Sequence, residues 1–475
     1  MWSQGLRIIE FSLTDSIRCA TGDGRSCDMK KGWHMRIGNS ANARQTAPDG
    51  SHAKSRDVVA LFLISLVVRL IYVLGTGTSV NFIGDSPRYD LLSDRALSLS
   101  FDFEQPEFIV SPGYPIFLAV IKFVAGTHWI SVMETVQAVL SAAETVLLFG
   151  IAHLLWQNRR ISVLAAIGHA FYPPNLLSVP YIAQETLFEF FWVASIYWLI
   201  RSVKDGTYRS VCISALSYGL GYLTKSHILL FSPFICVYYL LNNDTILESA
   251  KKTFVFGVIS VLMSVPWGVH NWRTKDAYIL SSSGYGSHFL VAHNDDFYTF
   301  LFDTPPIGSP EWSRLNKWTD LHVFEEINAK RRETGMSDKE FQKMCYSYGV
   351  QWCRENPDKL FWMNVRDFVG LLRPGASKSH QPFKVWLASF LICTPVFVLA
   401  CAGIVRNLIS NFRLHFWILG IFLSMLVYVY QFYFQARFRA ITIEQFYLIY
   451  CAFMIDFILS RMMRKDAAKA PQIDS

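Results

Sequence analysis

Charged residues are scarce in this chain of 475 residues, and several motifs that would assign a soluble function are absent. Only 17% of the residues are charged whereas 52% are hydrophobic, a balance that excludes a set of ordinary soluble domains. The nine cysteines form no CxxC pair, so the sequence supports neither a zinc site nor a redox motif. No block of about five to eight Lys and Arg residues occurs, and we therefore assign the net charge of +7 to basic cytoplasmic loops and not to nucleic-acid binding.

What the composition favours is a set of apolar helices. Aromatic residues make up 15% of the chain and the mean hydropathy is +0.26, as is typical of helices packed in lipid. We expect an all-α polytopic membrane protein with about ten transmembrane helices. The expected spans are 58–74, 130–156, 161–182, 184–201, 210–223, 226–241, 253–270, 384–405, 412–433 and 440–460. Pro173 and Pro174 must kink or break the third, and the short fifth and sixth could form one bent pair.

Basic residues in the short loops predict the orientation, because Lys and Arg concentrate on the cytoplasmic side. All these loops can be cytoplasmic only if the apolar stretch 112–126 lies along the membrane surface. Residues 1–57 lack a signal peptide's apolar core and are expected to be a disordered cytoplasmic segment, with Met29 or Met35 as alternative starts. The expected regions beyond it are a transmembrane core (58–270) with an acidic extracytoplasmic loop (77–128), a small extracytoplasmic domain (271–383), C-terminal transmembrane helices (384–460) and a cytoplasmic tail (461–475).

Three local features carry expectations of their own. Arg69 interrupts the first span, and we expect it to snorkel or to pair inside the helix bundle. A helix is predicted over Asp338–Glu355, ending before Pro357. If this helix carries both Cys345 and Cys353, their separation of about 12 Å along its axis excludes a disulfide.

An acidic turn follows the first span and is the first candidate for chemistry. It contains Asp85, Arg88, Tyr89 and Asp90. A carboxylate at the membrane face, partly shielded from water, suits a general base that takes a proton from an acceptor hydroxyl. The alternative is that Asp85 caps a helix opening at Ser86, since Asp before a helix with Pro in its first turn fits capping. Both interpretations stay open.

Basic residues on the same predicted face form the second candidate. They are Arg437 and Arg439 between the last two spans, Arg273 after the span that ends near Trp267, and Lys225 between two short helices. Arg binds phosphate oxygens bidentately and Lys supplies a point charge, so together they could bind a phosphate or diphosphate. Each residue taken singly is also explained by snorkelling at a span end.

Two further residues are weaker candidates. His293 could bind a metal or a phosphate, although a loop histidine more often does neither. Glu185 begins the fourth span; it could orient a substrate, but an acidic residue in a first turn favours helix capping.

In order and content these segments resemble a known family, the polytopic GT-C glycosyltransferases that use polyprenyl-phosphate sugars, in the branch of protein O-mannosyltransferases and lipid A aminoarabinose transferases. Similar family segments are an acidic first loop, a Pro-Gly-Tyr-Pro segment, a Glu-Thr-Leu-Phe span start, a Leu-Thr-Lys stretch and an Arg-Tyr-Arg turn. They correspond here to Gly84–Ser86, Pro112–Pro115, Glu185–Phe188, Gly219–Lys225 and Arg437–Arg439; Pro266–Trp267 with Asn271–Arg273 and Glu355–Pro357 add two more.

The resemblance implies roles for individual residues. It makes Asp85 the catalytic carboxylate and Glu104 its best-matching acidic partner, with Asp90 and Glu107 as competitors. Phe438 departs from the family's usual Tyr, and Gln105 stands where some relatives have a basic residue. Both departures leave the donor preference open.

The implied reaction is inverting transfer of a sugar from a polyprenyl-phosphate donor to an acceptor hydroxyl. The acceptor would be a lipid, a glycan or a protein, the cavity would be extracytoplasmic, and a bacterial plasma membrane is the expected location. No cofactor is assigned, and a requirement for a divalent cation stays open. A transporter or flippase for a lipid-linked or anionic substrate is the alternative, and a non-enzymatic scaffold is a third interpretation.

Overall fold

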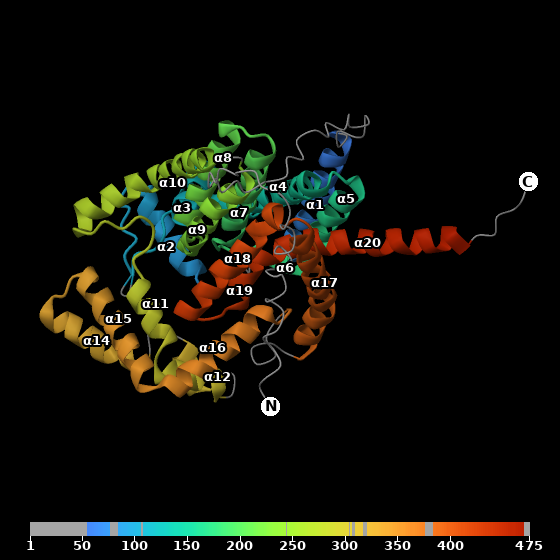
Figure 1. Cartoon of the computed structure of the whole chain (residues 1–475). Helices are drawn as coiled ribbons and strands as arrows, with labels where there is room; N and C mark the ends of the chain where they lie inside the picture. The colour runs from blue at the N-terminus through green and yellow to red at the C-terminus, as the bar shows by residue number, and fades with distance from the viewer. Residues whose placement is uncertain are drawn as a thin grey trace, which may run out of the picture. The chain divides into compact units, whose positions relative to one another are not determined.

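The structure is a computed structural model that describes residues 55–469 except 77–83, 106–107, 244, 304, 306–308, 317–320 and 376–382. Of the segment 1–57 that is expected to be disordered, residues 1–54 lie outside the described residues. Glu107 lies outside them too. Apart from one β-bridge between Glu104 and Ile109, the regular elements among the described residues are helices (Figure 1).

The helices of the first half are α1 (Ser55–Thr76), α2 (Ser86–Leu97), α3 (Gly113–Ala125), η2 (Gly126–His128), α4 (Trp129–Trp156), α5 (Arg159–Phe171), α6 (Pro173–Leu177), α7 (Glu185–Lys204), α8 (Tyr208–Thr224), η3 (Ser226–Phe231), α9 (Ser232–Asn242) and α10 (Ile246–Lys275). Those of the second half are α11 (Tyr285–Ala292), α12 (Asp295–Phe302), α13 (Pro310–Asn316), α14 (His322–Thr334), α15 (Asp338–Glu355), α16 (Pro357–Leu372), α17 (Phe383–Ser410), α18 (Phe412–Gln431), α19 (Ala436–Arg439), the π-helix η5 (Ala440–Glu444) and α20 (Gln445–Lys469).

Seven helical segments of the described chain are long and apolar enough to cross a membrane, which makes the chain a multi-pass membrane protein. They are Ser55–Thr76, Gly113–Trp156, Glu185–Lys204, Ile246–Lys275, Phe383–Ser410, Phe412–Gln431 and Ala436–Arg464. The other three expected spans fall on the shorter helices α5, α6, α8 and α9, so the number of ten stays a prediction. The expected break at the two prolines is confirmed, because α5 ends at Phe171 and α6 begins at Pro173.

One large apolar core holds the membrane helices together. Helices α4, α5, α7, α8, α9, α10, α17, α18 and α20 contribute to it, with Trp192 and Trp417 among the fully buried side chains. A second cluster joins α2 and α3 to the loop between them through Phe103 and Tyr114. In contrast, most residues in the apolar stretches of α1, α10 and α17 are exposed or half-buried, as in helices that face lipid.

Arg69 in α1 is fully buried. Of the two expected arrangements, snorkelling and pairing inside the bundle, the structure shows pairing. Its Nη1 donates to Ser65 Oγ at 2.5 Å, and its Nη2 lies 3.3 Å from His169 Nδ1. Glu144 Oε2 in α4 is 3.5 Å from the other ring nitrogen of His169. Because an isolated charge in hydrocarbon is costly, these groups are brought together from α1, α4 and α5.

The region between α10 and α17 forms its own apolar cluster from α11, α14 and α15, drawn in yellow and orange in Figure 1. The prediction for Asp338–Glu355 is confirmed to the residue: α15 starts with a capping box between Ser337 and Glu340. Cys345 and Cys353 both lie on this helix and both are free, as its geometry requires. That the region is extracytoplasmic stays a prediction.

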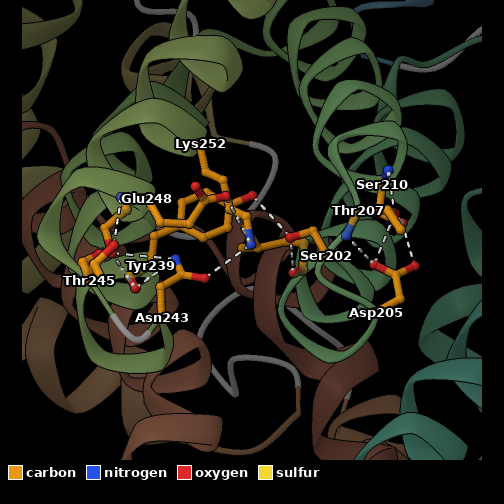
Figure 2. Close-up of polar contacts among 11 residues, drawn as sticks. Ser202, Asp205, Thr207, Ser210, Tyr239, Asn243, Thr245, Glu248 and Lys252 are labelled. Atoms are coloured by element: carbon orange, nitrogen blue, oxygen red, sulfur yellow. Dashed lines mark hydrogen bonds and ion pairs between the residues drawn. The ribbon is translucent and has the colours of Figure 1, made fainter.

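A polar network joins the end of α7, the start of α8, the end of α9 and the start of α10 (Figure 2). Lys252 Nζ donates to Asn243 Oδ1 at 3.0 Å, and Ser202 Oγ lies 3.0 Å from the Tyr239 hydroxyl. Asp205 accepts from Ser210 Oγ at 2.8 Å. This network fixes the ends of four helices around the basic stretch 201–209, at the opposite end of α7 from Glu185.

Candidate functional site

A cavity of about 900 Å³ lies where the first loop, the membrane helices and the α11–α16 region meet. Its charged and polar lining comes from segments far apart in the sequence, namely Asp85, Arg88 and Tyr89; Lys225, Ser226 and His227; Tyr285 and His288; Arg366 and Arg373; and Tyr433, Gln435 and Arg437. Its apolar lining includes Phe297, Phe300, Leu301, Leu315 and Leu321 from α12, α13 and the segment before α14. The cavity can therefore accept both a charged group and an apolar one.

Asp85 is the one acidic side chain among the described residues that line the cavity. It precedes α2, whose first turn contains Pro87, but its carboxylate accepts no capping hydrogen bond. Its Oδ1 is 3.4 Å from Arg88 Nη1 and its Oδ2 is 3.4 Å from Arg437 Nη1. Because one third of the side chain is exposed, it can meet a ligand in the cavity. Asp85 thus occupies the N-cap position of α2, as the capping interpretation requires, but its side chain does not make the capping hydrogen bond.

Tyr89 lines the cavity close to Asp85. It is buried, and its ring packs edge-on against Tyr114 at 5.0 Å between centroids. Burial and the neighbouring charge of Asp85 raise the pKa of the Tyr89 hydroxyl well above its usual value. At neutral pH this hydroxyl is therefore a neutral hydrogen-bonding group.

Arg437 comes from α19, a single turn that runs into the π-helix η5. Its Nε donates to Gln435 Oε1 at 2.6 Å, which holds the guanidinium towards Asp85. The ring of Phe438 lies 5.3 Å from the Arg437 guanidinium carbon and 4.9 Å from Lys225 Nζ. The phenyl ring that stands in place of the family's tyrosine thus packs against two cations at once.

Lys225 and Glu185 form a buried ion pair at the back of the cavity, 2.8 Å between Nζ and Oε1. Lys225 follows the last residue of α8, and Glu185 is the first residue of α7. Glu185 therefore begins a helix and also pairs with Lys225, a residue that lines the cavity. Among the charged lining residues, Lys225 is the most deeply placed, with a side chain that is 7% exposed.

Gly113 allows α3 to approach this ion pair. A Cβ atom at Gly113 would lie 2.8 Å from both the Leu223 carbonyl oxygen and Thr224 Oγ1. Such a distance is closer than real Cβ contacts, so the start of α3 can rest against the end of α8 only with glycine there. The Pro-Gly-Tyr-Pro segment thus supports the backbone immediately before Lys225.

Arg439 is not among the cavity residues, although it is only two positions from Arg437. It is buried, and its Nε donates to Glu444 Oε1 at 2.5 Å. Its Nη1 donates to the Gly370 and Arg373 carbonyl oxygens, and its Nη2 to that of Gly375 at 3.1 Å. The expected phosphate-binding role of Arg439 is not supported, because its guanidinium is occupied by the end of α16.

Glu104 also lies outside the cavity lining. Its carboxylate pairs with Lys275 Nζ and lies 3.7 Å from Arg331 Nη2. Asp102 Oδ1 joins the same cluster, 3.2 Å from Lys275 Nζ. These ion pairs link the first loop to α10 and α14, and the structure does not bring Glu104 to Asp85.

The remaining candidates are dispersed. Asp90 pairs with Lys122 Nζ at 2.5 Å, which fastens α2 to α3. Arg273 lies exposed in the last turn of α10. His293 is buried, stacks on Phe289 and places Nδ1 2.8 Å from the Phe289 carbonyl oxygen. None of the three lines the described cavity.

Several residues that line the cavity were not predicted from the sequence. They include Arg366 and Arg373, on and directly after α16, and His227 and His288, none of which belongs to a motif named above. Burial lowers the pKa of His288 to about 4, so this imidazole is neutral at pH 7. Within the described residues no group of three or more His, Cys, Asp or Glu side chains has an arrangement that could hold a metal.

Comparisons with known proteins address the fold and one segment of the chain. Residues 109–270 match the family described as Dolichyl-phosphate-mannose-protein mannosyltransferase. No curated protein sequence matches the chain.

Two solved structures of the archaeal oligosaccharyltransferase of Archaeoglobus fulgidus share the fold. One is AglB in complex with an inhibitory peptide and a dolichol-phosphate; at 12% identity and a TM-score of 0.53 the match covers 90% of this chain and 53% of that chain. The other is tethered to an acceptor peptide containing the NVT sequon, with 12% identity, a TM-score of 0.54, and coverage of 88% and 51%.

This chain thus spans about half the length of the oligosaccharyltransferases that it matches. At this level of identity the likeness concerns the fold. Taken with the segment match, it confirms the resemblance drawn from the sequence motifs: the chain has the fold of GT-C glycosyltransferases, and its residues 109–270 match the mannosyltransferase family.

Proposed function

We propose that the chain is an integral membrane glycosyltransferase that moves a sugar from a polyprenyl-phosphate donor to an acceptor hydroxyl. The observation that carries this proposal is the pairing of Asp85 with Arg437 in one cavity that also contains Lys225. A carboxylate next to cations at 3.4 Å supplies both groups that the transfer needs, a base and phosphate ligands. The match to a mannosyltransferase family and the dolichol-phosphate bound by the oligosaccharyltransferase support the choice of donor.

In the proposed reaction, Asp85 takes the proton from the acceptor hydroxyl as its oxygen attacks the anomeric carbon. The new bond joins the acceptor oxygen to that carbon, and the bond from the carbon to the phosphate oxygen breaks, so polyprenyl phosphate leaves with the electron pair. Attack opposite the leaving group inverts the anomeric centre. Arg437 and Lys225 stabilise the negative charge that develops on the phosphate.

The ion pairs suggest an order of events. Arg437 and Arg88 both hold Asp85, and a donor phosphate is a stronger bidentate partner for arginine than a single carboxylate oxygen at 3.4 Å. A donor that binds Arg437 would take over this partner and release the carboxylate for the acceptor. Glu185 keeps Lys225 in place while this happens.

The cavity is proposed to face the extracytoplasmic side. It lies at the Glu185 end of α7, whereas the basic stretch 201–209 follows the other end. A helix of 20 residues is about 30 Å long, which matches the hydrocarbon core of a bilayer. Because basic loops concentrate in the cytoplasm, the cavity falls on the opposite face.

The test compares the wild type with Asp85→Asn in membranes that contain the full chain and a radiolabelled polyprenyl-phosphate sugar. We expect sugar transfer to be lost in Asp85→Asn while binding of undecaprenyl phosphate to the purified variant persists. Asp94→Asn, at an exposed acidic residue of α2, is the matched control and should keep transfer. Unchanged transfer in Asp85→Asn would rule out this carboxylate as the base.

A transporter or flippase is the second candidate, and one observation favours it. Arg69, Glu144, His169 and Glu189 are ionisable groups buried within or beside the spans, and such groups often form proton or ion pathways in transporters. Glu144→Gln separates the two functions in vesicles that contain the purified chain and a fluorescent polyprenyl phosphate. Lipid translocation by a wild type that transfers no sugar, abolished in Glu144→Gln, would favour the transporter.

A further inference from the structure

Two arginines that the proposed reaction does not use also line the cavity. Arg366 is on α16, and Arg373 directly follows the last residue of this helix. They are seven residues apart, so they project from similar faces two helical turns from each other. This places two guanidinium groups on the cavity wall that the α11–α16 region provides.

Arg366 has a carboxylate partner in its neighbour. Its Nη1 is 2.9 Å from Asp367 Oδ1, and Asp367 Oδ2 also accepts from the Phe434 backbone N–H at 3.2 Å. Asp367 is buried and faces α19, so it secures the start of the Arg437 segment as well as Arg366. About a quarter of the Arg366 side chain stays exposed to the cavity.

Arg373 has no such partner among the described residues. No carboxylate in the described part of the chain is recorded within ion-pair distance of it, and its Nε is buried without a hydrogen-bond acceptor. Its carbonyl oxygen accepts from Arg439, which fixes the backbone while the side chain lines the cavity. A buried guanidinium N–H without an acceptor is costly unless a ligand supplies one.

The local charge balance also favours an anion. Arg366, Arg373 and Arg439 lie in or against the C-terminal half of α16, and among the described carboxylates Asp367 and Glu444 are the ones that pair with members of this group. Burial lowers the pKa of Arg373, and the positive charges of Arg439 and Arg366 lower it further. An oxyanion bound here would relieve this repulsion.

We propose that Arg366 and Arg373 form a second oxyanion subsite of the cavity, which binds a phosphate or carboxylate group carried by the acceptor. The proposal rests on the transferase function and adds the chemical class of the acceptor. Arg437 pairs with Asp85, whereas Arg366 pairs with Asp367 and Arg373 directly follows α16, so the arginines of the proposed subsite have other neighbours than Arg437. The volume of about 900 Å³ is large enough for a donor head group and part of an acceptor together.

The acceptor is the more suitable source of this anion than the donor. A polyprenyl chain must lie among the apolar spans, and Lys225 is at the junction of two apolar helices of the bundle, α8 and η3. Arg366 and Arg373 instead come from the region between α10 and α17, which a head group or a soluble acceptor reaches from water. A donor diphosphate is the competing source, and the experiment separates it.

The test measures thermal unfolding of the purified full chain in detergent with saturating undecaprenyl phosphate. Inorganic phosphate is then titrated, with sodium chloride at matched ionic strength as the salt control. We expect added phosphate to raise the melting temperature of the wild type further, since a ligand that binds only the folded state stabilises it. In Arg373→Gln the apparent phosphate affinity should fall at least about tenfold, because charged hydrogen bonds are lost. Arg373→Lys should recover part of it, and Arg332→Gln, at an exposed position of α14, should behave as wild type.

The outcomes distinguish this inference from the transferase proposal. A shift by undecaprenyl phosphate that survives in Arg373→Gln shows that the variant is folded and that the first subsite is intact. An equal response of wild type and Arg373→Gln to inorganic phosphate would overturn the second subsite and leave the transferase proposal untouched. If undecaprenyl diphosphate abolishes the response of the wild type to inorganic phosphate, the anion belongs to the donor and the acceptor assignment is wrong.

Discussion

Two carboxylates of the first loop, Asp85 and Glu104, are in opposite situations. Asp85 lines the cavity, and each of its oxygens is 3.4 Å from an arginine that also lines it. Glu104 lies in a cluster with Lys275 and Arg331, which joins three segments of the chain outside the cavity. Although the resemblance makes both residues catalytic, of the two only Asp85 lines the cavity.

Two arginines of one helical turn differ in the same way: one lines the cavity and the other does not. Arg437 is directed to Asp85, and Arg439 binds the carbonyl oxygens at the end of α16 together with Glu444. Since residues two apart on a helix point in nearly opposite directions, one of them can line a cavity only if the other is turned away. In both comparisons the role of a charge follows from its partners and not from its motif.

The largest expected effect separates Asp85 from Glu104. Asp85→Asn should lower the transfer rate by about 10²–10⁴-fold, the usual contribution of a general base. Glu104→Gln should change it much less, because this carboxylate does not line the cavity. Initial rates with labelled donor in the same membrane preparation measure both. A large loss in Glu104→Gln with an unchanged melting temperature would contradict the comparison.

The next effect separates Arg439 from Arg437 by stability. Arg439→Gln leaves Glu444 and several carbonyl oxygens buried without their cation, which should cost about 3–5 kcal/mol of the free energy of unfolding. Arg437→Gln should cost far less stability, because its side chain is half exposed, but should lower transfer by about 10²–10³-fold. Thermal melts of the purified variants decide this, and equal melting temperatures would refute the distinction.

A third test concerns the buried carboxyl that supports Arg366. Burial raises the pKa of Asp367 to about 6, partly opposed by Arg366 and the Phe434 N–H. In the unfolded chain the pKa is about 3.9, so between these values the folded state binds more protons and stability falls as pH rises. The fall from this group amounts to roughly 2 kcal/mol between pH 4 and 7.

Asp367→Asn removes this titration. We therefore expect the melting temperature at pH 7, measured relative to that at pH 4, to be higher in Asp367→Asn than in the wild type. The same difference in both proteins would mean that Asp367 keeps an ordinary pKa. Asp358→Asn, at an acidic residue in the first turn of the same helix, controls for a general change of charge.

The smallest expected effect concerns the support of Lys225. Gly113→Ala introduces a Cβ against Leu223 and Thr224, which should cost about 1–3 kcal/mol and move the end of α8. Gly257→Ala in α10 is the matched control, because no heavy atom lies within 4 Å of a Cβ there. A lower affinity for undecaprenyl phosphate in Gly113→Ala alone would connect this glycine to the site. Identical melts of the two variants would show that α3 does not press on α8.

The sequence by itself determined the all-helical membrane class, the break at Pro173 and the limits of α15. These features depend on apolar runs, prolines and a capping box, whose effects act within a few residues. It also identified Asp85, Arg437, Lys225 and Glu185 as candidates, because each stands at the end of an apolar segment. Such positions gather at a membrane face whatever the packing of the helices.

Only the tertiary structure decided which of these charges share a cavity. Arg366 and Arg373 carry no local signal, and Glu104 and Arg439 have the same sequence context as residues that line the cavity. The different roles come from contacts between distant segments: Arg439 and Gly370 are 69 residues apart in the sequence, and Arg437 and Asp85 are 352 apart. Because a side chain turns towards whichever distant partner packing brings within reach, its role follows from the folded arrangement.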